Sequence, residues 1–175
     1  MEKIETIDVV KGAVAGLVGG IVATVVMGGF QAFLSSLAEE EKKSKKKEED
    51  PATVKAAEEI SEVVFDHKLT KSEKEPAGEA MHYAMGATSG LIYGIASEIA
   101  PMTTIGLGIP FGAAVWLVAD DVVVPALGLA KPATEYPLST HAYALSSHLV
   151  YGLTTDLVRR AVRDLLDQNY TANRL

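Results

Sequence analysis

Six ionisable side chains lie in or beside apolar segments of a chain otherwise rich in glycine, alanine, valine and leucine. They are Glu79, His82, Asp120, Asp121, His141 and His148. Polar groups in such surroundings cost free energy, so these side chains are the candidate binding residues. Glu79 and His82 are three residues apart and share a helical face. His141 and His148 also share a face, and His148 lies about 10 Å further along the helix.

Carboxylates and imidazoles in one place can serve four purposes. They can ligate a first-row transition metal, and histidines on adjacent helices can ligate haem. They can relay protons or mark an ion pathway, because imidazole changes charge near neutral pH. Alternatively, the histidines hydrogen-bond across helices or to Asp120 or Asp121 and only hold the helices together. The residue types leave all four open.

Several classes of protein are excluded or disfavoured by the sequence. The net charge of −7 provides no basic face for nucleic acid. The chain has no cysteine, which excludes disulfides, thiolate metal sites and cysteine nucleophiles. A nucleophile elbow, a phosphate-binding loop and a His-Glu-x-x-His zinc motif are also absent, so we do not expect an enzyme.

Four long apolar runs must position the candidate residues. Each is close to the ~20 residues that cross the ~30 Å hydrocarbon layer as a helix. We therefore predict an all-α integral membrane bundle of four transmembrane helices, forming a single membrane domain over residues 1–175. The predicted spans are residues 11–37, 77–99, 106–124 and 139–158. The first run is too long for the apolar region of a cleaved signal peptide.

The segments outside the spans are charged or polar. We predict a charged loop over residues 39–76, in which residues 51–66 form a short amphipathic helix on the bilayer or the bundle end. Pro76 is expected to precede the second span, and Pro110 is able to kink the third. We expect the tail over residues 167–175 to be frayed.

Glycines recur at four-residue intervals in the first two spans. They are Gly12, Gly16, Gly20 and Gly28, with Thr24 filling the remaining position of the series, followed by Gly86, Gly90 and Gly94. This spacing predicts small-xxx-small packing, in which helix backbones approach closely. A weak repeat, His82-x-x-x-Gly86 against His148-x-x-x-Gly152, suggests two equivalent helix pairs, although so few matched positions also arise by chance.

An up-down order of the four spans brings the six candidate residues toward one membrane face, with His148 lying deepest. The opposite face receives a different set of charges. They are Glu98, Asp156, Arg159 and Arg160. We expect these to form ion pairs at the membrane interface.

Three segments resemble one known family. They are HYAMGATSGLIYG at 82–94, WLVADDVVVPALGLAKP at 116–132 and YPLSTHAYALSSHLVYGLTTDLVRR at 136–160. The chain resembles the YagU-like family of small bacterial inner-membrane proteins, a domain family of unknown function. The resemblance implies a multi-pass protein of the bacterial inner (cytoplasmic) membrane, and it brings no established catalytic residues.

The leading functional hypothesis is a binding or transport-type membrane protein that uses the His/Asp cluster at one membrane face. The alternative is a structural or accessory subunit that docks a larger membrane complex through its glycine-lined faces and charged loop. The expected partners are the lipid bilayer and either other membrane proteins or further copies of the chain. Metal and haem are the candidate cofactors.

Overall fold

The computed structural model describes residues 5–38 and 50–172, which are helical without a strand. The α-helices are α1 Thr6–Ala38, α2 Ala52–Phe65, α3 Lys71–Ile99, α4 Ile109–Val115, α5 Val124–Ala126 and α6 Leu138–Ala172. The shorter elements are the 3-10 turns η1 Pro101–Thr104 and η3 Ala133–Glu135, and the π-helix η2 Trp116–Val123. Because α4, η2 and α5 follow without a break, they form one helical rod. The predicted all-helical fold class is confirmed.

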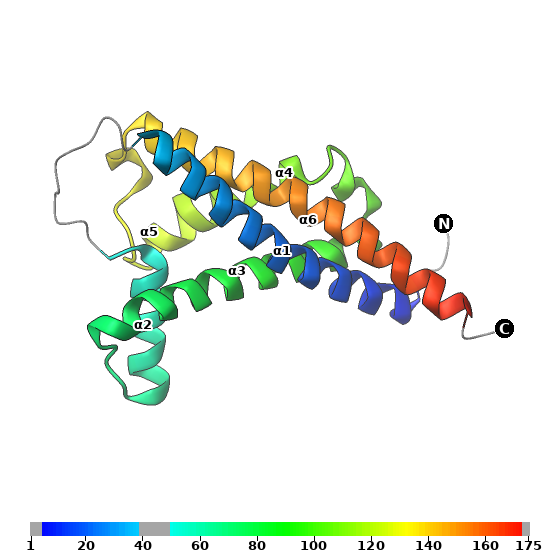
Figure 1. The fold of residues 1–175 in the computed structure, drawn as a ribbon, viewed down its shortest axis with the longest axis horizontal. Coiled ribbons are helices and arrows are strands. Elements are labelled where there is room, and N and C mark those ends of the chain that lie inside the picture. Colours follow the sequence, from blue (N-terminus) through cyan, green and yellow to red (C-terminus); the bar gives the residue numbers. More distant parts are fainter. Residues whose placement is uncertain (1–4, 39–49, 173–175) are drawn as a thin grey trace.

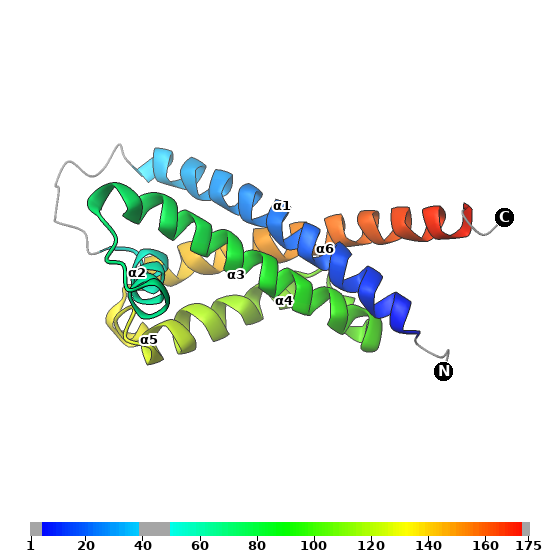
Figure 2. The same cartoon turned by 90° about the horizontal axis from the view of Figure 1, so that it is seen from below.

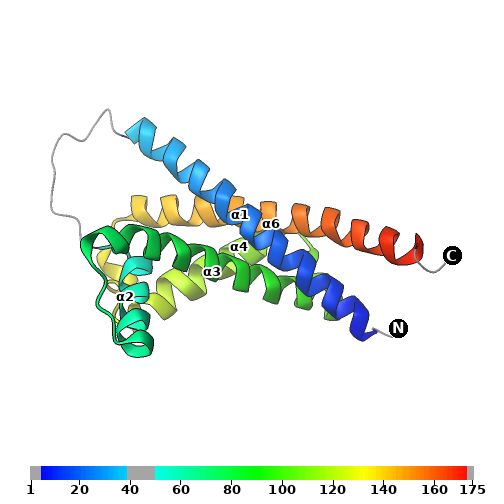
Figure 3. The same ribbon diagram turned by 60° about the horizontal axis from the view of Figure 1, so that its bottom comes forward.

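The long helices alternate in direction (Figure 1). α1 and the α4–η2–α5 rod run one way, and α3 and α6 run the other way. We call the end where α1 begins and α6 ends the terminal end (Figure 2). The opposite end, which α2 crosses nearly at right angles to the long helices, is the α2 end (Figure 3).

α1 and α3 pack backbone against backbone through glycine. A Cβ added to Gly16 would lie 2.7 Å from the Cα of Gly94, and one added to Gly90 would lie 2.7 Å from the Cα of Gly20. Real side-chain carbons do not approach that closely, so any larger residue forces the helices apart. α1 leaves this contact toward its end, and a Cβ on Gly28 would meet nothing within 4 Å.

α4 and α6 form a second close contact that resembles the first. A Cβ added to Gly152 would lie 2.7 Å from the Cα of Gly112. Gly152 faces Gly108 and Gly112 in the same way as Gly86 faces residues 20 and 24 of α1. The matched glycines of the sequence repeat therefore make matched contacts.

α3 meets the α4–η2–α5 rod through side chains instead. The rings of Tyr93 and Phe111 stack at 4.2 Å between centroids, and Phe111 lies 6.0 Å from the ring of Tyr151. The Tyr151 hydroxyl donates a hydrogen bond to the Gly86 carbonyl at 2.7 Å. A hollow of about 290 Å³ remains beside Tyr93 and Phe111 on this side.

Several polar side chains are buried, while many large apolar side chains are exposed. Ser147, Thr155 and Asp156 are fully buried. Large apolar side chains, by contrast, are exposed along α1 and the α4–η2–α5 rod, among them Phe33 at 58% and Val122 at 56%. Two segments, Thr6–Leu37 and Ile109–Ala126, are long and apolar enough to cross a membrane.

The start of α3 differs from the prediction. The helix begins at Lys71 and contains Pro76, although we expected Pro76 to precede it. A capping box explains the early start, because the Glu73 carboxylate accepts hydrogen bonds from the Thr70 backbone N–H at 2.8 Å and the Thr70 hydroxyl at 2.7 Å. These bonds and the neighbouring His67 lower the pKa of Glu73 from 4.5 to about 2.

Two further boundaries were predicted wrongly. The third rod begins at Ile109, because Gly106, Leu107 and Gly108 have positive φ and form a turn; Pro110 therefore lies in the first helical turn and causes no kink. The tail is helical to Ala172. It is held by Lys11, whose Nζ lies 2.8 Å from the Asp167 carboxylate and 4.1 Å from the Tyr170 ring centroid.

α2 matches its predicted range within one residue at each end. Its first turns are buried against α3, where Val54 contacts Gly78. The Lys74 ammonium bridges the two elements, 2.8 Å from Asp50 and 3.0 Å from Glu58. Hydrogen bonds to these two carboxylates raise the pKa of Lys74. Most of the charged run that precedes α2, residues 39–49, lies outside the described residues.

Candidate functional site

η2 turns both acids of the cluster toward α6. A π-helix bonds each residue to the fifth along, so its turns hold more residues than those of an α-helix. Neighbouring residues therefore differ less in direction, and Asp120 and Asp121 each reach a histidine of α6. The π-helical backbone thus lets two adjacent acids, Asp120 and Asp121, both face α6.

Asp120 faces the deeper histidine of α6. Its Oδ2 lies 3.7 Å from Nδ1 of His148, too long for a hydrogen bond but close enough for an ion pair. The same nitrogen lies 2.9 Å from the carbonyl oxygen of Ala144. A carbonyl only accepts, so Nδ1 of His148 carries a proton.

Asp121 faces the outer histidine. Its Oδ1 lies 3.6 Å from Nδ1 of His141. The other ring nitrogen, Nε2, lies 3.0 Å from the carbonyl oxygen of Ala133 in η3. The indole of Trp116 meets the same imidazole edge-on, with 6.2 Å between ring centroids.

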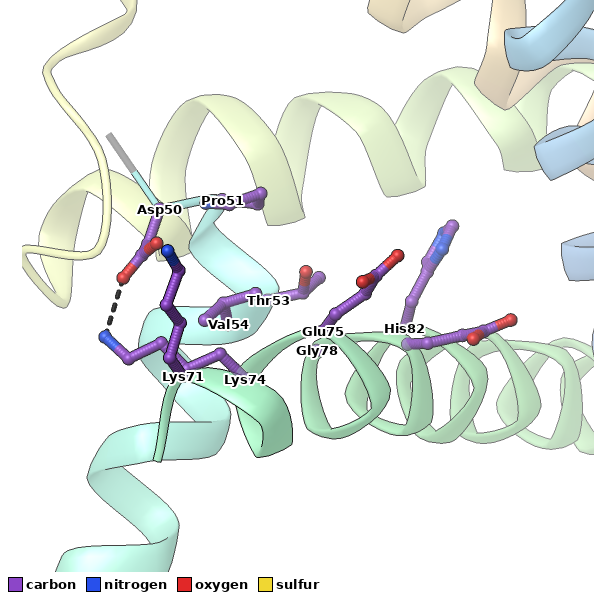
Figure 4. A pocket seen from close by; sticks show the side chains of 10 residues that line it. Asp50, Pro51, Thr53, Val54, Lys71, Lys74, Glu75, Gly78 and His82 are labelled. Carbon is purple, nitrogen blue, oxygen red and sulfur yellow. Dashed lines mark hydrogen bonds and ion pairs between the residues drawn. The ribbon is translucent and has the colours of Figure 1, made fainter. Parts of the chain in front are cut away.

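α3 adds the remaining two predicted residues from across a groove. His82 lies within electrostatic reach of Asp120, His148 and Glu79. A groove of about 470 Å³ runs from the α2 end to His82, and Glu79 and Glu75 also line it. Figure 4 shows Glu75 and His82 pointing from α3 into this groove. All six predicted residues thus belong to one region, which we call the His/Asp cluster.

The contacts differ from the metal-ligand arrangement considered from sequence. The part of the chain that the structure describes holds no group of three histidine, aspartate or glutamate side chains placed to bind a metal ion. The histidines instead bond to backbone carbonyls and face one acid each. The arrangement is suited to holding protons or positive charge between imidazole and carboxylate.

Sequence reasoning missed four contributors to this region. Trp116 lies four residues before Asp120, a spacing that places both on one side of a helix. Glu75 precedes Glu79 by the same interval. The Ala133 and Ala144 carbonyls leave no signal in the sequence, because every residue carries a backbone carbonyl, whatever its side chain.

The terminal end carries the expected ion pairs. The fully buried carboxylate of Asp156 accepts hydrogen bonds from Arg159 Nη2 and Arg160 Nε, each at 2.8 Å. Glu98 pairs with Arg163 at 3.0 Å, a partner that the sequence analysis did not name. Arg163 Nη2 also donates to Asp8 at 3.1 Å. α1, α3 and α6 therefore meet through these charges.

Residues 51–157 match the family model described as a protein of unknown function (DUF1440). The chain belongs to this family. The matched range begins at α2, ends within α6 and contains all six residues of the His/Asp cluster. No curated protein and no solved structure shows significant similarity to the chain.

Proposed function

We propose that this DUF1440 protein is a multi-pass protein of the bacterial inner membrane whose four helical rods cross the bilayer. The outward apolar side chains and the buried polar ones support this, because lipid is the solvent that favours such a distribution. The glycine contacts between α1 and α3 and between α4 and α6 support it too, since close backbone packing associates helices in lipid. The lipid bilayer is then its first partner.

Within this bundle, the His/Asp cluster binds a cation from the α2 end. The observation that carries this proposal is the pair of His–Asp contacts, His141–Asp121 and His148–Asp120, beside the inner end of an open groove. Carboxylates that face titratable imidazoles in apolar surroundings attract positive charge.

The contacts at the terminal end support access of the cation to the His/Asp cluster from the α2 end only. Its buried carboxylate, Asp156, is already bonded to two guanidinium groups. Two contacts separate that end from the cluster. They are the backbone contact of Gly112 with Gly152 and the aromatic contact of Phe111 with Tyr151. A cation at His148 therefore has its entrance through the groove.

The test uses the full chain purified in mild detergent. Thermal unfolding is recorded as a function of pH and of added divalent metal, for the wild type and for a His82→Gln/His141→Gln double variant. Cation-dependent stabilisation should disappear in the double variant. His67→Gln is the matched control, because His67 lies in the exposed link before α3.

Retained cation dependence in the double variant would contradict the proposal. If no cation affects any of the proteins and the variants only lower the melting temperature, the cluster is packing between helices. The alternative of a structural or accessory subunit would then stand.

A further inference from the structure

We infer that the cation held by this site is the proton, and that His141 and Asp121 share it. The inference rests on the proposed function and identifies the substrate of the same site. It follows from which atoms the ring nitrogens face.

Both nitrogens of His141 face oxygen atoms that accept hydrogen bonds. The Ala133 carbonyl requires the proton of a neutral ring to sit on Nε2. Nδ1 then presents a lone pair to Asp121 Oδ1, which is also an acceptor when ionised. A proton added to Nδ1 turns this repulsive contact into an ion pair of imidazolium and carboxylate, and a proton added to Oδ1 turns it into an attractive contact between neutral groups.

His148 repeats half of this arrangement deeper in the helix. Its Nδ1 donates to the Ala144 carbonyl and faces Asp120. A further proton on this ring would therefore bind at Nε2. The titratable groups around the two histidines are Asp120 and Asp121 from η2 and His82 and Glu79 from α3. Protons arriving through the groove meet His82 before His148.

A metal ion fits these contacts poorly. A metal takes a lone pair from imidazole, and the carbonyl bonds already commit one nitrogen of each ring. On α6, the uncommitted nitrogens are Nδ1 of His141 and Nε2 of His148, and these residues lie seven positions, or about 10 Å, apart along the helix. Ligands of one zinc ion lie about 2 Å from it, so both rings cannot bind the same ion.

The chain carries its own reporter of this proton. Trp116 is the only tryptophan and meets the edge of His141. A protonated imidazole quenches a neighbouring indole, so Trp116 fluorescence should fall in one step on acidification as His141 takes up the proton. We would record it on the full chain in detergent, exciting tryptophan selectively.

The variants give distinct expectations. His141→Gln should abolish the step, and His67→Gln should leave it unchanged. Asp121→Asn should move the step to lower pH, because the carboxylate no longer stabilises the imidazolium. If His141→Gln fails to fold by circular dichroism, the Asp121→Asn shift still tests the inference.

A flat profile in the folded wild type, or a step unchanged in both variants, would overturn the shared proton. Calorimetric titration with Zn²⁺ alone separates the two proposals. Stoichiometric zinc binding that is lost in His148→Gln would overturn the proton while keeping a cation site. A flat fluorescence profile without zinc binding would remove the proposed function as well.

Discussion

The two ends of the helix assembly both place acids against basic side chains, but the two sets of partners differ. At the terminal end, Asp156 and Glu98 bond to arginines at 2.8 to 3.0 Å. At the α2 end, Asp120 and Asp121 face histidines at 3.7 and 3.6 Å. Guanidinium stays charged at every physiological pH, whereas imidazole does not. One end therefore has permanent pairs that hold helices, and the other has pairs whose charge depends on pH.

Removing the Asp156 carboxylate, which pairs with permanently charged arginines, should lower the stability of the fold most. Asp156→Ala leaves Arg159 buried without its carboxylate, and breaking such a pair costs about 3–5 kcal/mol. Thermal or denaturant unfolding in detergent measures this loss. Asp164→Asn on an exposed position of the same helix is the control, and equal melting temperatures for the two variants would contradict a structural role for the terminal end.

Disrupting the glycine contact between α1 and α3 should cause the second-largest loss of stability. Gly90→Leu places a side chain where a Cβ alone would lie 2.7 Å from Gly20, and overpacking of this kind costs about 1–3 kcal/mol. Gly28→Leu enters open space on the same stripe and should be neutral. Unfolding curves of the two variants provide the comparison, which fails if Gly28→Leu is the worse of the two.

Removing an acid at the α2 end should affect the pH dependence of stability more than stability itself, in contrast to the terminal end. Asp120→Asn should change the free energy of unfolding by no more than about 1 kcal/mol, since the His148 contact is long and partly exposed. It should nevertheless alter how the melting temperature varies around neutral pH. A large loss of stability at all pH values would place Asp120 with the structural acids.

The smallest effects belong to exposed acids outside the proposed spans. Hydrogen bonds from Lys11 and Arg163 lower the pKa of Asp167, and those around Thr70 lower that of Glu73 to about 2. Groups with lowered pKa stabilise the fold above their ordinary pKa and lose that contribution as pH falls through the folded value. Glu73→Gln should therefore change stability slightly at neutral pH and not at all below about pH 2. A pH series of unfolding curves tests this, and a difference that grows on acidification would contradict it.

The sequence was sufficient for the all-helical fold class, but not for the pairing of the charged side chains. Apolar runs and amphipathic spacing predicted the helices, because both are local signals. The match of Asp121 with His141 depends on the rotation of η2 against α6, which glycine contacts elsewhere set. The start of α3 was misjudged because the Thr70–Glu73 capping box outweighed a proline within the helix. The DUF1440 match shows the family, and the inner-membrane location remains a proposal.

The π-helix also has a consequence for how this family tolerates insertions and deletions. Each residue of an α-helix turns the chain by about 100°. Loss of one residue between Trp116 and Asp120 would let η2 relax to an α-helix without breaking the rod. Adjacent acids would then point about 100° apart, so Asp120 and Asp121 would no longer face α6 together as they do in η2. Sequence length in this short stretch, and not residue identity alone, thus decides whether a relative retains the His/Asp cluster.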